Sequence, residues 1–207
     1  MFTSALTVSR RLIALPITIA VSAAIFLGSA FAPVSAQAAG YYDYLLPPYG
    51  SCGTGAEGDM SKTYTDWTAG ARCLVNEARN KARLDSYATY YNLLDSSYHK
   101  ASDISVCQPD YRNVDAVHHA CNQPMDKWIK WPRTCASYGY AENYYIGSGS
   151  LSTARAAVSW WLNSPGHRAA LLSPSFTGHG LMYSGPTTYP GIGPNARIWI
   201  HHMAYCT

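Results

Sequence analysis

Charged residues are scarce in this chain, since Asp, Glu, Lys and Arg make up only 13% of its 207 residues. It also lacks a long basic run, and 15 Lys and Arg residues stand against 12 Asp and Glu residues. A protein that binds nucleic acid needs a concentrated basic surface to neutralise phosphates. The composition therefore excludes nucleic acid as an expected partner.

Two common site motifs are absent as well. The six cysteines include no Cys-x-x-Cys pair, which argues against a zinc cluster built from cysteines. No Gly-x-Ser-x-Gly elbow, which presents the nucleophilic serine of many hydrolases, occurs either. An even number of cysteines in an exported chain instead indicates disulfides, whose connectivity the sequence leaves open.

The N-terminus carries the pattern of an export signal. Arg10 and Arg11 precede an apolar run, and Ala36-Gln37-Ala38 fits the small-residue rule for signal peptidase. We expect residues 1–38 to be a signal peptide and the mature protein to be secreted and extracellular. Prolines interrupt the run and no basic stop-transfer cluster follows, so we expect no stable membrane insertion after cleavage. An uncleaved anchor is the alternative.

Residues 39–64 are rich in Tyr, Gly and Pro and show neither a helical nor a strand period. We interpret them as an N-terminal arm that precedes one domain, residues 65–207. The whole chain holds 17 tyrosines and six tryptophans, which predict a surface of aromatic and hydroxyl groups. Such a surface suits neutral ligands such as peptides, glycans or lipid head groups.

Apolar spacing predicts two helices between about Asp66 and Ser105. The first has a stripe that runs from Trp67 to Ala82. The second has a stripe of Tyr87, Tyr90, Tyr91, Leu94, Tyr98 and Ala101. Prolines and cysteines break residues 106–139 into loop with short helices.

A third helical stripe, Ala154 to Trp161, is ended by Ser164-Pro165. The same pair can begin a short helix, with Ser164 as N-cap and Pro165 in the first position. This places His167 in the opening turn, where the helix dipole disfavours the imidazolium. The neutral ring could ligate a metal, accept a proton or merely pack against the preceding helix. Capping explains Ser164 without a nucleophilic role.

Two strands are predicted, at 180–183 and 197–205, joined by Gly/Pro-rich residues 184–195, which we interpret as loop. In the second strand, Ile198 and Ile200 share one face while Trp199 and Met203 lie on the other. Both faces are thus covered, as expected for a sheet between two helical layers. Alternation sends His201 and His202 to opposite faces, where we interpret them as structural, and we place His179 in a turn.

Three candidates for a binding site remain: His167, Glu142 and one residue of the pair His118-His119. Two histidines and a carboxylate from separate loops can hold zinc with one position open for water or substrate. Alternatively, Glu142 binds backbone N–H groups, and one histidine of the pair packs while the other is exposed. No catalytic residue is assigned.

Several segments together resemble one family. They are "LVNEARNKARL" (74–84), "YAENYYIGSGS" (140–150), "AVSWWLNSPGHRAALLSPSFTGHGL" (157–181) and the closing "RIWIHHMAY" (197–205). From about Trp67 to Tyr205 the chain resembles the CAP superfamily of cysteine-rich secretory, antigen 5 and pathogenesis-related proteins, in particular its bacterial secreted SCP-like branch. The Ser-Pro-Gly-His-Arg segment is the most specific part of the match.

The resemblance implies an α+β fold, a three-layer α-β-α sandwich with a central, mainly antiparallel sheet, here stabilised by disulfides. It also implies a ligand cleft of His119, Glu142 and His167, with His118 as the alternate for His119. In some members such a set holds a divalent cation, zinc or another. This chain departs from the family pattern at Ala141, which replaces the glycine of the Gly-Glu-Asn motif, and in its cysteines between 107 and 135.

The expected function is that of a secreted binding module whose cleft engages a lipid, a peptide or a cell-wall-associated ligand. The first alternative is a metal-dependent hydrolase of peptides or esters that uses His119, Glu142 and His167. The second is a structural, disulfide-hardened extracellular module. We favour binding over catalysis because a fold by itself does not specify an activity. The sequence assigns neither the ligand nor the oligomeric state.

Overall fold

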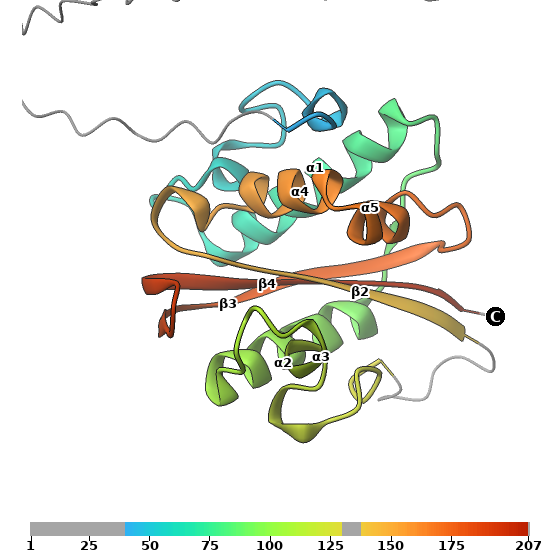
Figure 1. The fold of residues 1–207 in the computed structure, drawn as a ribbon. Coiled ribbons are helices and arrows are strands. Elements are labelled where there is room, and N and C mark those ends of the chain that lie inside the picture. The colour runs from blue at the N-terminus through green and yellow to red at the C-terminus, as the bar shows by residue number, and fades with distance from the viewer. Residues whose placement is uncertain (1–39, 130–137, 207) are drawn as a thin grey trace, which may run out of the picture. The chain divides into compact units, whose positions relative to one another are not determined.

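A four-stranded sheet forms the middle of the computed structural model, which describes residues 40–129 and 138–206. Its strands are β1 (Ala88–Thr89), β2 (Tyr138–Gly147), β3 (Gly178–Tyr189) and β4 (Gly193–Cys206). The order is β1-β3-β4-β2, with β1 parallel to β3 and the other pairs antiparallel. Figure 1 shows β2, β3 and β4 edge-on between two layers of helices. The expected signal peptide and Cys135 lie outside the described residues.

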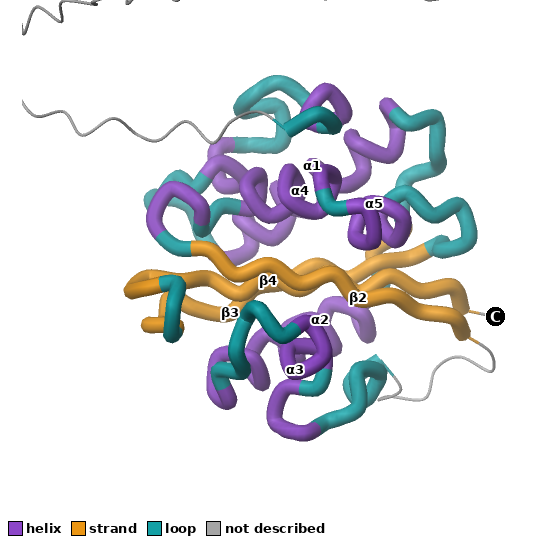
Figure 2. Tube along the Cα trace, in the orientation of Figure 1, coloured by secondary structure: helices purple, strands orange, loops and turns teal. Residues whose placement is uncertain are grey.

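Helices cover both faces of this sheet (Figure 2). One layer holds α1 (Tyr64–Lys81), α4 (Ala154–Asn163) and α5 (Pro165–Leu171). The opposite layer holds α2 (Tyr91–Cys107) and α3 (Val114–His118). The predicted fold class, a three-layer α-β-α sandwich with a mainly antiparallel sheet, is confirmed. Within the described residues, no helix has the length and apolarity needed to cross a membrane.

Helix α1 follows the predicted stripe. A capping box fixes its start, because the Thr63 hydroxyl accepts from the amide of Asp66 while the Asp66 carboxylate accepts from the amide of Thr63. The helix buries Trp67, Leu74, Val75 and other members of the stripe against the sheet.

Helix α2 exists as predicted, but it begins after Tyr87 and Tyr90, and Ala101 is the one member of the predicted stripe within the helix that is buried. Tyr91 and Tyr98 are exposed. The buried face consists of Leu93, Ser96, Ser97, Lys100, Ala101 and Ile104. The prediction of the buried face from hydrophobic periodicity was wrong because half of the buried positions of α2 are polar. Those polar side chains form hydrogen bonds inside the protein.

Helices α4 and α5 meet at Ser164, as predicted. Pro165 occupies the first position of α5. The hydroxyl of Ser164 makes no capping bond to the backbone. It lies instead 2.8 Å from Nδ1 of His167.

Strand β4 is buried on both faces, as its alternation predicted. Trp199 and Met203 pack into the core beneath α1 and α4, whereas Ile198 and Ile200 pack into the core beneath α2 and α3. The adjacent histidines follow the same alternation. The ring of His201 contacts Trp161 in the first layer, and His202 bonds to Ser96 in the second.

Two expectations about the second half of the chain are wrong. Residues 184–195 are not a long loop, because β3 continues through Thr187 and Tyr189, which pair with Ala196 and Gly193 across a register shift. His179 does not lie in a turn. It pairs with Met203 within the sheet and is fully buried. The glycines on either side of it allow α2 and the ring of Tyr90, which directly precedes α2, to approach closely.

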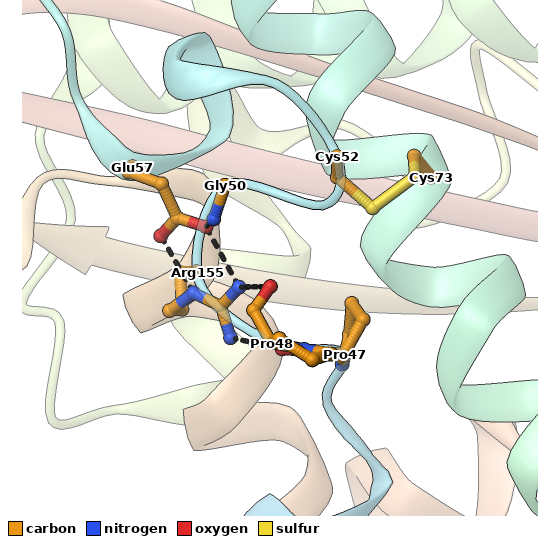
Figure 3. Close-up of a disulfide and its surroundings, with 7 residues drawn as sticks. All are labelled: Pro47, Pro48, Gly50, Cys52, Glu57, Cys73 and Arg155. Atoms are coloured by element: carbon orange, nitrogen blue, oxygen red, sulfur yellow. Dashed lines mark hydrogen bonds and ion pairs between the residues drawn. A yellow bond between two sulfur atoms is a disulfide. The ribbon is translucent and has the colours of Figure 1, made fainter.

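The region before α1 is held against the sandwich at several points. Its two short 3-10 helices, Asp43–Leu45 and Thr54–Glu57, contact α1 and α4. A disulfide joins Cys52 to Cys73 of α1, and Arg155 of α4 makes a two-pronged ion pair with Glu57 (Figure 3). A second disulfide, Cys107–Cys121, closes the segment between α2 and the 3-10 helix Ala120–Asn122. Nothing is described of the side chain of Cys206.

Candidate functional site

Glu142 of β2 is the centre of a buried polar cluster. Its Oε1 lies 2.6 Å from Nδ1 of His118 at the end of α3, and its Oε2 lies 2.6 Å from Nε2 of His202 on β4. The register of β2 against β4 places Glu142 directly opposite His202. Both ring nitrogens must carry hydrogen, because an ionised carboxylate only accepts hydrogen bonds.

The carboxylate is held in its charged form. Burial by itself would raise the pKa of Glu142, but the hydrogen bonds from His118 and His202, together with the influence of Lys100, lower it to about 2. The ammonium of Lys100 is 4.0 Å from Oε1 of Glu142. Two opposite charges thus lie close together in the interior, where either charge without the other would destabilise the folded protein.

Lys100 enters the cluster from α2. Its side chain is buried and donates to the backbone carbonyl of His118. Burial lowers the pKa of Lys100, and the carboxylates of Glu142 and Asp103 oppose that change. Lys100 therefore both compensates the charge of Glu142 and holds the end of α3 in place.

Ser96, His202 and Glu142 form a chain of hydrogen bonds with the residue types of a catalytic triad. Oγ of Ser96 is 2.5 Å from Nδ1 of His202. The ring is reversed with respect to a serine hydrolase, in which Nδ1 faces the acid and Nε2 faces the serine. Ser96 is also only 1% exposed. A substrate cannot reach this hydroxyl, so the chain of bonds is a structural network.

His118 projects from this network toward the surface. Its side chain is 17% exposed. Because Nδ1 is committed to Glu142, Nε2 is the ring nitrogen that remains for a ligand. The rings of His118 and Tyr144 pack in a T-shaped arrangement, with centroids 5.3 Å apart and planes at 82°.

His167 also lies beside Tyr144, at 6.0 Å between ring centroids. Burial, together with the proximity of His118, lowers the pKa of His167 to about 4. The expected neutral ring is therefore retained, with burial as its main cause. Nδ1 faces the hydroxyl of Ser164, which leaves Nε2 as the second nitrogen. The amide of Asn143 fixes the backbone by donating to the carbonyl of His167.

An exposed aromatic residue completes the surroundings of His167. Trp160 of α4 is 38% exposed, and its ring centroid is 4.6 Å from that of His167. The ring of Trp160 also lies 5.9 Å from that of Tyr145, between centroids. We name the set His118, Glu142, His167, His202, Lys100 and Ser96 the His–Glu cluster, with Trp160 at its rim.

The structure brings together three of the four sequence candidates. His118, Glu142 and His167 gather around Tyr144, whereas His119 does not join them. The ring of His119 is 49% exposed and lies 3.0 Å from the carbonyl oxygen and 3.2 Å from a carboxylate oxygen of Asp115. Alignment with the family favoured His119, but the last turn of α3 directs His118 toward the sheet.

The residues of the cluster do not fit a three-ligand cation site. Both oxygens of Glu142 accept hydrogen bonds from histidines, and a cation there would also meet the ammonium of Lys100. Only the Nε2 atoms of His118 and His167 remain, and a typical zinc site needs three protein ligands. Across residues 40–129 and 138–206, no group of three or more His, Cys, Asp or Glu side chains is arranged to hold a metal ion.

Sequence reasoning missed Lys100, Ser96 and the role of His202. A signal for His202 was present, because strand alternation separates it from His201 and β2 carries Glu142 in the neighbouring position. Lys100 and Ser96 gave no signal, since a lysine and a serine within a helical pattern normally face solvent.

The fold is thus a three-layer sandwich. Its cluster holds a buried glutamate, Glu142, that is hydrogen-bonded to His118 and His202, and His167 lies beside the neighbouring Tyr144. The model of the Cysteine-rich secretory protein family, CAP, matches residues 74–191. This match spans more than half of the chain, which therefore belongs to the CAP family. No curated protein sequence matches the chain significantly.

Solved structures of bacterial proteins are similar at low identity. An extracellular protein with an SCP domain from Bacillus anthracis is 18% identical over 70% of this chain and 42% of its own, with a TM-score of 0.43. An outer surface protein from Borrelia burgdorferi is 18% identical over 66% and 90%, with a TM-score of 0.45. A cysteine-rich secretory protein from Staphylococcus aureus is 14% identical over 68% and 40%, at 0.44. This chain thus spans less than half the length of the first and third proteins.

Proposed function

We propose that this CAP-domain protein is a secreted binding module that recognises an uncharged, amide- or hydroxyl-bearing ligand of the cell wall at the His–Glu cluster. The observation that carries the proposal is the state of the two outer histidines. His118 and His167 each have one ring nitrogen fixed by a partner inside the protein, and the other nitrogen has no hydrogen-bond partner among the described residues. Rings held in this way offer preorganised hydrogen-bonding groups to a ligand.

The charge of the cluster supports a neutral ligand. Lys100 compensates Glu142, and the low pKa of His167 keeps that ring uncharged. The exposed part of Trp160 adds an apolar surface against which a sugar ring or a peptide group can pack. Charge attraction contributes little here, so recognition rests on hydrogen bonds and stacking.

Hydrolysis has weaker support. Ser96 is inaccessible, and the cluster offers two metal ligands rather than three. The pair Ser164–His167 has the distance of a nucleophile and its base. A base whose pKa is about 4 is, however, a weak acceptor of the serine proton at neutral pH.

Co-sedimentation with insoluble peptidoglycan tests the proposal. We expect the oxidised wild-type protein to sediment, and His118→Asn and Trp160→Ala to lose most of this binding. His119→Asn is the matched control, because it makes the same change one residue away on a ring outside the cluster. Equal sedimentation of all four proteins, or none for the wild type, would contradict the proposal.

Calorimetric titration with zinc tests the alternative function, that of a metal-dependent hydrolase. We expect no saturable one-to-one binding to the wild-type protein. Saturable binding that is lost in both His118→Asn and Glu142→Gln would show that the cluster rearranges into a cation site, and would favour the metal-dependent hydrolase over the binding module.

A further inference from the structure

A pocket of about 770 Å³ lies apart from the His–Glu cluster, in the layer of α1 and α4. Its walls come from the region before α1, from Trp67 of α1, from the start of α4 and from β4. None of its lining residues belongs to the His–Glu cluster. The volume is that of a small-molecule site, and the lining combines apolar residues with a few polar ones, as such sites do.

Four charged side chains line the pocket: Asp43, Glu57, Arg155 and Arg197. Two of them neutralise each other. Arg155 donates from Nε and Nη2 to the two oxygens of Glu57, at 2.6 and 2.7 Å, and its guanidinium also reaches the carbonyls of Pro47 and Pro48 (Figure 3). This leaves one separate positive charge and one separate negative charge.

Arg197 supplies the positive charge, and no described carboxylate pairs with it. The residue is only 7% exposed. One N–H group donates to Oγ of Ser152 at 2.8 Å and one contacts Sδ of Met60 at 3.6 Å, while the guanidinium carbon lies 4.2 Å from the centroid of Trp67. Nε has no hydrogen-bond partner. A guanidinium has five N–H donors, so this buried cation is under-satisfied and would be stabilised by an anion.

Asp43 supplies the negative charge. Its carboxylate accepts from the hydroxyl of Ser159, the side-chain amide of Asn163 and the backbone amide of Gly40. All three donors are neutral, and no ion pair links Asp43 to a cation in the described part of the chain. A ligand ammonium would therefore find an anion whose position is fixed and whose charge is not compensated.

Helix α4 sets the spacing of these two charges. Arg197 is bonded to Ser152, just before the helix, and Asp43 is bonded to Ser159 within it. Thr153 is the N-cap of α4, and the six residues from it to Ser159 advance about 9 Å along the axis at 1.5 Å each, with Ser152 one residue further out. An extended chain advances roughly 3.3–3.6 Å per residue, so about three residues span this length.

We infer that this pocket binds a short peptide of about three residues with both ends free, its carboxylate at Arg197 and its ammonium at Asp43. The ligand carries no net charge but two separated charges, as the pocket does. Small or apolar side chains would lie against Trp67 and Leu46, which also line the pocket.

Calorimetry with trialanine, N-acetyl-trialanine and trialanine amide tests both ends without changing the protein. We expect trialanine to bind, and each blocked peptide to bind about tenfold or more weakly, the loss typical of one charge-assisted hydrogen bond. Failure of trialanine to bind at millimolar concentration, or equal affinity for all three peptides, would overturn the inference.

Two variants test whether the peptide ammonium binds at Asp43 and the peptide carboxylate at Arg197. Asp43→Asn keeps an acceptor but removes the charge, so it should weaken trialanine and leave N-acetyl-trialanine unchanged. Arg197→Met should weaken trialanine and leave the amide unchanged, and the peptide series on the wild type decides the matter if this variant does not fold. Asp110→Asn, an exposed carboxylate on the opposite layer, is the matched control. Binding of laurate with no binding of trialanine would mean that the pocket takes an acyl carboxylate, and would overturn the peptide inference.

Discussion

The side chains of Lys100 and Glu142 form an ion pair that is almost completely withdrawn from solvent, with exposures of 1% and 0% and a separation of 4.0 Å. The pair connects α2 to β2, and through the carbonyl of His118 it also connects α3. It therefore lies beneath the surface that we propose for ligand binding and fixes the position of His118.

Removing one partner of this pair should destabilise the protein strongly. We expect Lys100→Met to lower the free energy of unfolding by about 3–5 kcal/mol, because it leaves the carboxylate of Glu142 buried without a cation. The double variant Lys100→Met/Glu142→Leu should recover part of the loss. Urea denaturation measures both. Arg112→Met, which breaks an exposed pair with Asp110, should cost less than about 1 kcal/mol. A double variant less stable than the single one would contradict the account.

Two buried histidines in the other layer should make stability depend on pH. Burial lowers the pKa of His179 to about 3, with Arg72 and Arg79 contributing, and burial likewise lowers the pKa of His201 well below 6.5. The rings take up protons more readily in the unfolded chain than in the folded one. Their contribution to stability is therefore complete above pH 6.5 and is lost as the pH falls from 6.5 toward 3.

The double variant His179→Leu/His201→Leu should reduce this dependence, and His167, whose pKa is lowered to about 4, should supply part of the slope that remains. Each histidine contributes a slope of up to about 1.4 kcal/mol per pH unit. Urea denaturation between pH 7 and pH 5 measures it, and this range lies above the pH at which Glu142 titrates. His119→Asn, which replaces an exposed histidine, should leave the slope unchanged. An unaltered slope in the double variant would show that other groups control it.

Gly180 of β3 should tolerate no side chain. A Cβ there would lie 2.0 Å from the carbonyl carbon of Leu93 in α2, so the helix backbone would have to move. We expect Gly180→Ala to lower the free energy of unfolding by about 1–3 kcal/mol. Gly166→Ala in α5 is the matched control, because a Cβ meets nothing within 4 Å there and should change stability by less than about 1 kcal/mol. Thermal unfolding of the two variants decides the point.

The disulfide Cys52–Cys73 should stabilise the region before α1. It spans 21 residues, and its loss through Cys52→Ser/Cys73→Ser should cost about 3 kcal/mol. Limited proteolysis should then cut residues 40–63 before the rest of the domain. Cys107→Ser/Cys121→Ser should cost a similar amount without that early cleavage. Simultaneous digestion of the whole domain in the first variant would contradict this assignment.

Sequence patterns predicted the sandwich well where burial was apolar. The stripe of α1, the break at Ser164-Pro165 and the two covered faces of β4 all appear in the structure, because each depends on local chemistry and periodicity. Patterns failed where burial was polar or pairing was distant. Lys100 is buried only because Glu142 arrives from another element, and residues 184–195 become strand only because β3 and β4 pair with each other.

The sequence predicted which types of residue form the candidate site, but not which neighbouring histidine enters it. Glu142 and His167 stand in recognisable motifs, and the choice between His118 and His119 was left open, since a one-residue difference at the end of a five-residue helix decides which ring turns inward. The pocket at Arg197 had no sequence signal. It arises from the packing of the region before α1 against α4, which no short-range pattern encodes.

The adjacent histidines of β4 have a consequence for folding. A slip of one residue in the pairing of β4 with β2 would bring His201 to Glu142 in place of His202, so this glutamate discriminates poorly between the native register and its nearest error. Discrimination then falls to the neighbouring positions. Trp199, whose indole N–H donates to the carbonyl of Ser152 at 3.0 Å, cannot occupy the space of Ile198 or Ile200 on the other face. The bulk of Trp199 thereby helps to select the correct alignment of the central strand, together with the other side chains that a slip would move to the opposite face.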